Sequence, residues 1–324
     1  MKKIFFVFAL LLVIVLVGLY VLIPTQLKIS AIGYVQCTDN AANRLLAEPS
    51  QWKLWWPDSV SQNSGPASKA TVVSTMSDSG FVYNGTVFRV KQKSFSGVIL
   101  STPFRGSEIQ GQFAHAASSN DSMAVIIQFK TIVSLNPLSR IQQYLEAQRL
   151  KKNCVAILDH LKKFLENKEN VYGISIKEIR VTDTLLASHF FLSATYPSVD
   201  KIYESVDALK TYIAANGASE TGFPMLNVTL VDSSHYKTRV AIPINKEIKE
   251  SEAMQLKKMI PGRILVTEIK GGQQTINNAY TQLRYFLFDN EFASPAIPFE
   301  SMITNRVQEK DSSKWITRIY YPIL

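Results

Sequence analysis

A nine-residue pattern occurs twice in the C-terminal half of the sequence. Segments 236–244 (YKTRVAIPI) and 315–323 (WITRIYYPI) share aromatic-x-Thr-Arg-(Val/Ile)-x-x-Pro-Ile at an offset of 79 residues. Five upstream positions match at an offset of 74: Leu209, Tyr212, Ile213, Asn216 and Pro224 correspond to Leu283, Phe286, Leu287, Asn290 and Pro298. Five residues of loop account for the change of offset. Such a repeat predicts two copies of one structural unit related by a pseudo-twofold axis.

The two copies differ at one position of chemical interest. At the offset of 74, Leu226 in the first copy becomes Glu300 in the second. A carboxylate where the fold otherwise accepts leucine is a candidate functional group. The alternative, an ordinary exposed strand carboxylate, remains open from sequence alone.

Each copy is predicted to form a strand, a helix and a hairpin. Residues 199–216 carry an apolar stripe at helical spacing, and Asn216-Gly217 is typical of a helix end. The predicted strands are 174–180, 185–195, 225–232, 236–244, 263–270, 300–307 and 315–323, with a second helix at 275–289. Residues 168–171 are predicted to be a short polar join.

The N-terminus begins with a candidate membrane span. Residues 4–23 contain no charged side chain and match the length that a hydrocarbon core of about 30 Å requires. Lys2 and Lys3 precede them, which places the N-terminus in the cytoplasm and the remainder outside by the positive-inside rule. We favour an uncleaved transmembrane signal anchor over residues 1–24. A cleaved signal peptide is the alternative, although no Ala-x-Ala site follows Ile23.

Residues 27–168 are predicted to form an antiparallel sheet followed by one long helix. Alternating or β-rich runs occur at 27–35, 70–76, 80–93, 97–100 and 122–133, and a short helix is expected after Asp39 or Asn40. Residues 142–167 carry an apolar stripe at helical spacing. Between the first strand and the sheet lies Leu-Leu-x-x-Pro-x-x-Trp-x-x-Trp-Trp-Pro, residues 45–57.

This order and the tryptophan run resemble the START/polyketide-cyclase-like (SRPBCC) superfamily. The resemblance implies a helix-grip fold, in which the sheet wraps the long C-terminal helix around an apolar cavity. Thr38-Asp39-Asn40 stands where members usually carry a proline. Two interpretations of Trp52, Trp55 and Trp56 remain open: they line a cavity mouth or the bilayer interface, or they are core.

Residues 173–324 resemble the GyrI-like (AraC/Rob-type) effector-binding family. The matching residues are Pro261-Gly262, Lys270-Gly271, Ala279-Tyr280, Pro298-x-Glu300 and Trp315-x-Thr317-x-Ile319-Tyr320-x-Pro322-Ile323. The resemblance implies small-molecule binding in a cleft between the copies, with Glu300 among aromatic residues facing cationic or aromatic ligands. In one hydrolytic branch the matching carboxylate is catalytic. Met302 and Gln273-Gln274 stand where relatives often have aromatic residues, which puts specificity and hydrolysis in doubt.

The predicted ligand-binding residues are Glu300, Tyr280, Phe223, Trp315 and Tyr320. A carboxylate beside aromatic rings attracts a delocalised cation through charge and ring quadrupole, and burial would raise its pKa. Because strand side chains alternate, at most one of Trp315 and Tyr320 is expected to face the cleft. The overall fold class is therefore α+β: a transmembrane helix, a helix-grip domain and a duplicated effector-binding domain.

Charge and composition exclude several other functions. Residues 1–170 carry 18 Lys and Arg against 10 Asp and Glu, so +8 of the net charge of +9 lies beside the membrane segment. Anionic headgroups would attract it, but we favour the alternative interpretation, a solvated basic face. No basic-aromatic pattern or helix-turn-helix suggests nucleic acid, and Cys37 and Cys154 have no zinc spacing. We expect no metal and no cofactor; a single disulfide or two buried thiols are both compatible with the sequence.

Three hypotheses for the function follow. The leading one is a membrane-anchored, outward-facing protein that binds an apolar, aromatic or cationic small molecule near Glu300. The second is a hydrolase of electrophilic small molecules with Glu300 as its catalytic carboxylate. The third is a lipid-handling protein that uses the START-like cavity.

Overall fold

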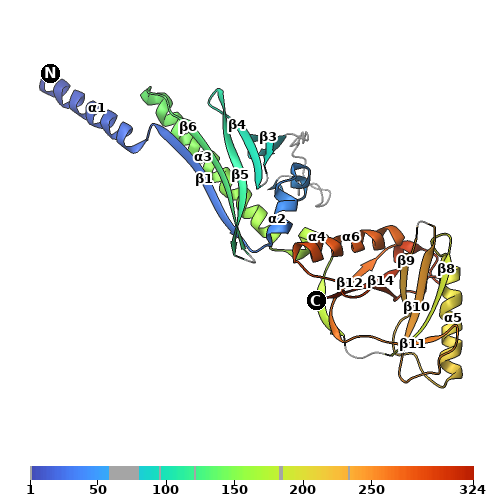
Figure 1. Ribbon diagram of the computed structural model, residues 1–324. Coiled ribbons are helices and arrows are strands. Elements are labelled where there is room, and N and C mark those ends of the chain that lie inside the picture. The colour runs from blue at the N-terminus through green and yellow to red at the C-terminus, as the bar shows by residue number, and fades with distance from the viewer. Residues whose placement is uncertain (1, 58–79, 95, 120–121, 182–184, 233) are drawn as a thin grey trace. The chain divides into compact units, whose positions relative to one another are not determined.

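The computed structural model describes residues 2–57, 80–94, 96–119, 122–181, 185–232 and 234–324. They form two compact units, Met1–Asn167 and Lys168–Leu324 (Figure 1). Both units combine helices with antiparallel sheets, so the predicted α+β fold class is confirmed. The strand predicted at 70–76 lies outside the described residues.

The first unit begins with the apolar helix α1 (Lys2–Leu22), whose stretch Ile4–Leu22 is long and apolar enough to cross a membrane. The end of α1 is fastened to the start of the long helix α3 (Pro137–Leu165). Arg140 is buried there: its Nε donates to the Ile23 carbonyl oxygen at 3.0 Å, and its guanidinium lies 4.6 Å from the Tyr20 ring centroid. Tyr20 also donates a hydrogen bond to the Leu135 carbonyl.

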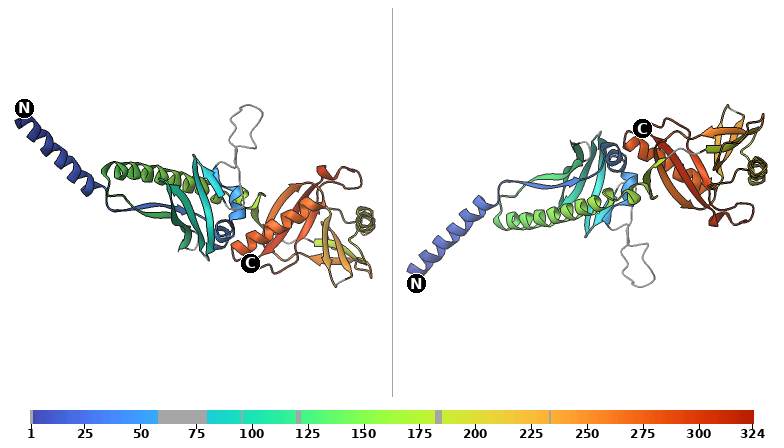
Figure 2. Two further views of the ribbon diagram at one scale, coloured as in Figure 1. Left: turned by 90° about the horizontal axis from the view of Figure 1, so that it is seen from above. Right: turned by 90° about the horizontal axis from the view of Figure 1, so that it is seen from below.

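Six antiparallel strands form the sheet of this unit, in the order β1-β6-β5-β4-β3-β2. They are β1 (Gln26–Val35), β2 (Gly80–Tyr83), β3 (Thr86–Ser94), β4 (Gly97–Phe104), β5 (Ser107–Ser119) and β6 (Ser122–Ile132). Helix α3 lies along the sheet and packs on β1, as Figure 2 shows from two sides. The sheet therefore grips the long helix, as predicted.

Two differences from the expected strands have local causes. A single strand was expected over 80–93, but Asn84 and Gly85 adopt positive φ values of 46° and 74° and divide it into the β2–β3 hairpin. Strand β5 was not predicted, because its sequence SEIQGQFAHAASS is rich in residues with weak strand propensity. Its buried positions nevertheless alternate.

The long helix begins five residues before the predicted Gln142. Asn136 caps it by accepting hydrogen bonds from the backbone nitrogens of Leu138 and Ser139, and Pro137 occupies the first turn. Cys154 of α3 is a free, buried thiol, and the disulfide with Cys37 is not formed. Burial raises the pKa of the Cys154 thiol to about 12.

The three tryptophans follow helix α2 (Asp39–Leu46) on and just after the 3₁₀ helix η1 (Pro49–Leu54). All are buried, and Trp52 and Trp56 stack with ring centroids 5.8 Å apart. The Trp52 and Trp56 indole nitrogens donate to the carbonyl oxygens of Leu46 and Val82 at 2.9 and 2.8 Å. They are core residues, and the interpretation that they lie at the bilayer interface is wrong.

The second unit is built on one eight-stranded antiparallel sheet, in the order β11-β8-β10-β9-β13-β14-β12-β7. The strands are β7 (Lys177–Val181), β8 (Leu185–Ser193), β9 (Met225–Leu230), β10 (Tyr236–Ile244), β11 (Gln255–Lys258), β12 (Gly262–Lys270), β13 (Phe299–Met302) and β14 (Ile316–Ile323). Strands β11 and β12 are three residues apart in sequence yet stand toward opposite ends of this order. The sheet therefore curls into a half-barrel.

The predicted duplication is present in the register of this sheet. One copy is β8, α5 (Val199–Ala215), β9 and β10; the other is β12, α6 (Gln273–Asp289), β13 and β14. Leu226 pairs with Val240 as Glu300 pairs with Ile319, and Leu226 and Glu300 pair with each other where β9 meets β13. The pseudo-twofold axis therefore passes between Leu226 and Glu300.

Short strands before each copy connect the two halves. Strand β7 precedes the first copy but pairs with β12 of the second, while β11 precedes the second copy but pairs with β8 of the first. Strand β11 was not predicted. The polar join expected at 168–171 is instead helix α4 (Lys168–Tyr172), because Tyr172 is buried against Phe286 and its hydroxyl donates to Asp289 at 3.0 Å.

Candidate functional site

Glu300 lies in the middle of the eight-stranded sheet and is only 5% exposed. Its paired neighbours are Leu226 on β9 and Ile319 on β14, and directly paired side chains share a face of a sheet. Leu226 belongs to the apolar core under α5. Glu300 therefore points to the helix-covered face, which places a carboxylate in the interior of the unit.

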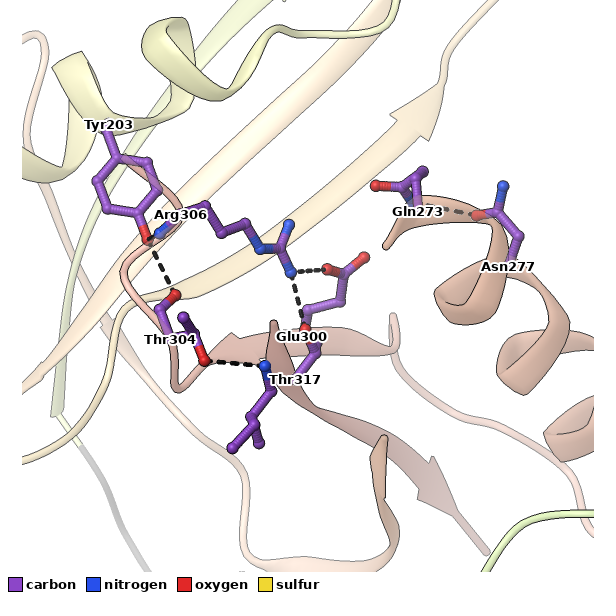
Figure 3. Close-up of polar contacts among 8 residues, drawn as sticks. Tyr203, Gln273, Asn277, Glu300, Thr304, Arg306 and Thr317 are labelled. Carbon is purple, nitrogen blue, oxygen red and sulfur yellow. Dashed lines mark hydrogen bonds and ion pairs between the residues drawn. The ribbon is translucent and has the colours of Figure 1, made fainter. Parts of the chain in front are cut away.

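Arg306 is the direct partner of this carboxylate. It is 4% exposed, and its Nη2 donates to Glu300 Oε2 and to Thr317 Oγ1, each at 3.0 Å (Figure 3). The guanidinium lies 5.0 Å from the Trp315 ring centroid, within the range of a cation–π contact. The arginine is thus held by a carboxylate, a hydroxyl and an indole.

The loop that carries Arg306 joins β13 to β14 and is fixed by local hydrogen bonds. Tyr203 of α5 accepts from the Arg306 backbone nitrogen at 2.9 Å and donates to the Thr304 carbonyl oxygen at 3.3 Å. Thr304 Oγ1 accepts from the Ile316 nitrogen at 2.9 Å. The backbone is therefore fixed on both sides of Arg306, and the Arg306 side chain is buried in the interior of the unit.

The second carboxylate oxygen of Glu300 turns toward the start of α6, where Gln273 donates to Asn277 at 3.1 Å (Figure 3). At the offset of 74, α5 has Val199, Tyr203 and Val206 in the places where α6 has Gln273, Asn277 and Tyr280. The second copy has therefore become more polar on its helix as well as on its strand.

Burial governs the proton affinities in this region. It raises the pKa of the Glu300 carboxyl above its ordinary value, and the charge and hydrogen bond of Arg306 oppose that shift without cancelling it. The pKa of Tyr280 is also raised, first by burial and then by the negative charge of Glu300. The same two causes raise the pKa of Tyr196, between β8 and α5, to about 12.

The structure separates the five predicted ligand-binding residues into two groups. Tyr280 and Trp315 are brought to the Glu300 side of the sheet. Tyr320 stacks on Phe299 on the opposite face, with centroids 4.9 Å apart, because it is out of phase with Thr317 and Ile319 along β14. Phe223 lies in the loop before β9 and is 48% exposed.

Sequence reasoning missed Arg306 and Tyr196. The change of repeat offset from 74 to 79 places five extra residues between Glu300 and Trp315, and Arg306 lies in that segment. Arg306 could therefore have been predicted as a partner of Glu300, because it is a cationic residue in an insertion that follows a carboxylate without a counterpart in the first copy. Tyr196 precedes the first predicted helix and has no comparable mark in the sequence.

The arrangement can hold a planar cation by charge, hydrogen bonds and an aromatic face. In this structure Arg306 supplies that cation. Among the described residues no group of three or more His, Cys, Asp and Glu side chains is placed to bind a metal ion. An apolar pocket of about 460 Å³ in the same unit lies elsewhere and includes Phe299 and Met225 of the opposite face.

Comparison with known proteins found similarity only at the level of structure. No family model and no curated protein matches the sequence. The C-terminal domain of EcmrR is 16% identical, with 47% of this chain and 98% of that chain covered at a TM-score of 0.41. A hydrolase from Listeria innocua is 9% identical, with 46% and 92% covered at 0.37. SAV2435 bound to tetraphenylphosphonium is 12% identical, with 47% and 94% covered at 0.31.

Proposed function

We propose that the chain is a membrane-anchored protein that binds a small apolar, aromatic or cationic molecule, held beside Glu300 in the second unit. The observation that carries this proposal is a buried carboxylate at the one central position where the chain's own repeat has Leu226. In this assignment residues 1–24 are the anchor, 27–168 a START/SRPBCC-like domain and 173–324 a GyrI-like effector-binding domain.

Stability does not explain the carboxylate. Removing two charges from water costs several kcal/mol per ion, and apolar replacements of buried ion pairs are often neutral or stabilising by about 1–4 kcal/mol. The first copy demonstrates that the same strand position accepts leucine within the core under α5. A carboxylate at Glu300 is therefore better explained by a ligand than by folding.

The ligand competes with Arg306 for the carboxylate and for the Trp315 face. A delocalised aromatic cation offers the charge of a guanidinium together with more apolar surface, which favours it in a site walled by Tyr280 and Trp315. Arg306 lies between β13 and β14 and not on a strand, so displacement of its side chain from the carboxylate breaks no strand pairing. Because Arg306 must first leave the carboxylate, the apparent affinity for the ligand is lower than the intrinsic affinity of the vacated site.

The test uses tetraphenylphosphonium, a delocalised aromatic cation, with the full-length protein in lipid nanodiscs and empty nanodiscs as the blank. Isothermal titration calorimetry should detect binding that Glu300→Gln weakens by at least about tenfold, since the charge is lost while the side-chain volume is kept. Glu268→Gln is the matched control, because Glu268 is a strand carboxylate of the same copy that pairs with Arg318 at the surface. Equal affinity in the wild type and Glu300→Gln would exclude this site.

A hydrolase remains the second candidate because burial raises the pKa of the Glu300 carboxyl, as an acid or base at neutral pH requires. In that case Glu300→Gln should abolish turnover of an electrophilic substrate while binding persists. For lipid handling by the first unit, native mass spectrometry of the detergent-solubilised protein is decisive: absence of any co-purified or added lipid rejects it.

Membrane anchoring rests on the length and composition of α1. We place the N-terminus in the cytoplasm because Lys2 and Lys3 precede the apolar stretch. Protease added to intact cells or right-side-out vesicles should digest both units. Protection of both units in intact vesicles, with digestion only after lysis, would reverse the orientation.

A further inference from the structure

The curled sheet of the second unit has a pocket on the face opposite to the Glu300 side chain. Arg239 and Ala241 of β10 line it, alternating with Val240 and Ile242 of the core beneath α5. Met225 and Phe299 line it from β9 and β13, one position out of phase with Leu226 and Glu300, and Leu226 also contributes to the lining. Its volume of about 460 Å³ lies within the usual range for small-molecule sites, about 300–1,000 Å³.

The wall of this pocket is mostly apolar. The segment between β11 and β12 contributes Met259, Ile260 and Pro261, and the ends of the second copy contribute Ile297 and Pro322. Ile260 is 86% exposed although it is a large aliphatic side chain. An apolar body would gain about 25 cal/mol for each Å² of such surface that it removes from water.

Every charged side chain among the described residues that line the pocket is cationic. These residues are Arg239, Lys257, Lys258 and Arg263. Arg263 is already paired with Glu178 at 2.7 Å. The lining thus repels a cation and attracts an anion, the reverse of the preference expected at Glu300.

The internal repeat identifies Arg239 as the residue of greatest interest. Its counterpart in the second copy, at the offset of 79, is Arg318, which pairs across the strands with Glu268 at 2.8 Å. The residue paired with Arg239 is instead Phe190. Within the described part of the chain, Arg239 Nε is buried and has no hydrogen-bond partner. A buried donor without an acceptor is costly, and a ligand acceptor would remove that cost.

We propose that this pocket binds an apolar molecule bearing a single anionic group, a carboxylate or sulfonate, with the anion on Arg239 and the apolar body against Met225, Phe299 and Ile260. The planar guanidinium suits bidentate recognition of such a group. Lys257 and Lys258 add positive potential on the β11 side. This site is separate from Glu300, on the other face of the same sheet.

The test compares three soluble probes with one aromatic body: 1-naphthylacetate, the neutral 1-naphthaleneacetamide and the cation 1-naphthylmethylammonium. Calorimetry with the full-length protein in nanodiscs should give affinities in the order anion, amide, cation. Arg239→Gln should weaken the anion by at least about tenfold and the amide by less than about twofold. Arg318→Gln, the same change at the repeat-related arginine, should leave both unchanged.

A second variant guards against misfolding of Arg239→Gln. Ile260→Glu alters an exposed side chain at the pocket and should weaken the anion more than the amide, because it adds a negative charge. Equal affinities for anion and cation, or equal losses of anion and amide in Arg239→Gln, would overturn the proposal. Tetraphenylphosphonium binding should be unaffected by Arg239→Gln, so failure here is distinguishable from failure of the Glu300 site.

Discussion

The two copies of the repeat make the same fold with different interiors. Where they meet, Leu226 of the first copy packs in an apolar core, while Glu300 of the second accepts a hydrogen bond from Arg306, which also donates to Thr317. The shared positions set the register and the pairing of the strands. The unmatched positions introduce charge, hydrogen bonds and aromatic contacts that the fold does not need.

The two copies also differ on the other face of the sheet. There the second copy has the surface ion pair Arg318–Glu268, whereas the first copy has Arg239 beside Phe190. One difference between the copies thus lies on each face of the sheet, and each places an ionic group near apolar side chains. The two sites that we propose therefore have opposite charge preferences on the two faces of one sheet.

Loss of Arg306 should produce the largest effect. Arg306→Met leaves Glu300 buried without its counter-ion, which typically costs about 3–5 kcal/mol. Urea unfolding of the full-length protein at pH 8 should detect this as a lower midpoint with an unchanged slope. Arg318→Met serves as the control, because it makes the same substitution at an exposed arginine on β14. It should lower the free energy of unfolding by less than about 1 kcal/mol.

The same variant predicts a direction of pH dependence. The Glu300 carboxyl has a raised pKa in the folded protein, and removing Arg306 raises it further, so the native state binds the proton more tightly than the unfolded chain. The stability of Arg306→Met should therefore fall as the pH rises from the ordinary value of 4.5 through the raised pKa, and recover on acidification. If the free energy of unfolding of Arg306→Met rose with pH over this range, Glu300 would not have a raised pKa in the folded variant.

A pair of identical substitutions compares the copies directly. Thr317 accepts a hydrogen bond from Arg306, whereas Oγ1 of its repeat partner Thr238 is buried without a hydrogen-bond partner among the described residues. Thr317→Val should cost about 1–2 kcal/mol, and Thr238→Val should be neutral or stabilising. Differential scanning calorimetry at neutral pH measures both; equal costs would mean that the two threonines have equivalent surroundings.

Restoring the apolar pattern should change stability little. The double variant Glu300→Leu/Arg306→Met replaces the ion pair by side chains like those of the first copy and should lie within about 1–2 kcal/mol of the wild type. It should also lose tetraphenylphosphonium binding. Chemical unfolding and calorimetric titration of one preparation test both statements, and a large loss of stability would show that folding requires the ion pair.

The smallest effect is expected at the surface pair. Glu268→Gln should change the free energy of unfolding by less than about 1 kcal/mol, because Glu268 and Arg318 are well exposed. The small difference should shrink further between 0.05 and 0.5 M salt, as Debye screening requires. A loss comparable to that of Arg306→Met would contradict the distinction between the two faces.

Much of this architecture could be predicted because it depends on periodic or repeated features. The repeat predicted which strands correspond, and alternation along β14 predicted that Trp315 and Tyr320 point to opposite faces. Features without periodicity escaped prediction. Strand β11 has only four residues, and its pairing with β8 of the other copy is a long-range contact. Arg306 lies in an insertion that has no counterpart from which its burial could be inferred.

The chemistry of the site was predictable only in part for the same reason. The sequence predicts that a carboxylate beside aromatic rings attracts a delocalised cation, since that follows from charge and ring quadrupole. That a side chain of the same loop provides the cation depends on the path of residues 303–315. This path is fixed by Tyr203 on a helix about a hundred residues away in sequence.

The central claim is that Arg306 and a ligand cation compete for the same carboxylate. A double-mutant cycle on tetraphenylphosphonium affinity, using Glu300→Gln, Arg306→Met and both together, tests it most directly. We predict that Arg306→Met strengthens binding by at least about tenfold when Glu300 is intact, and changes it by less than about twofold in the presence of Glu300→Gln. Equal effects of Arg306→Met in the two backgrounds would contradict the competition.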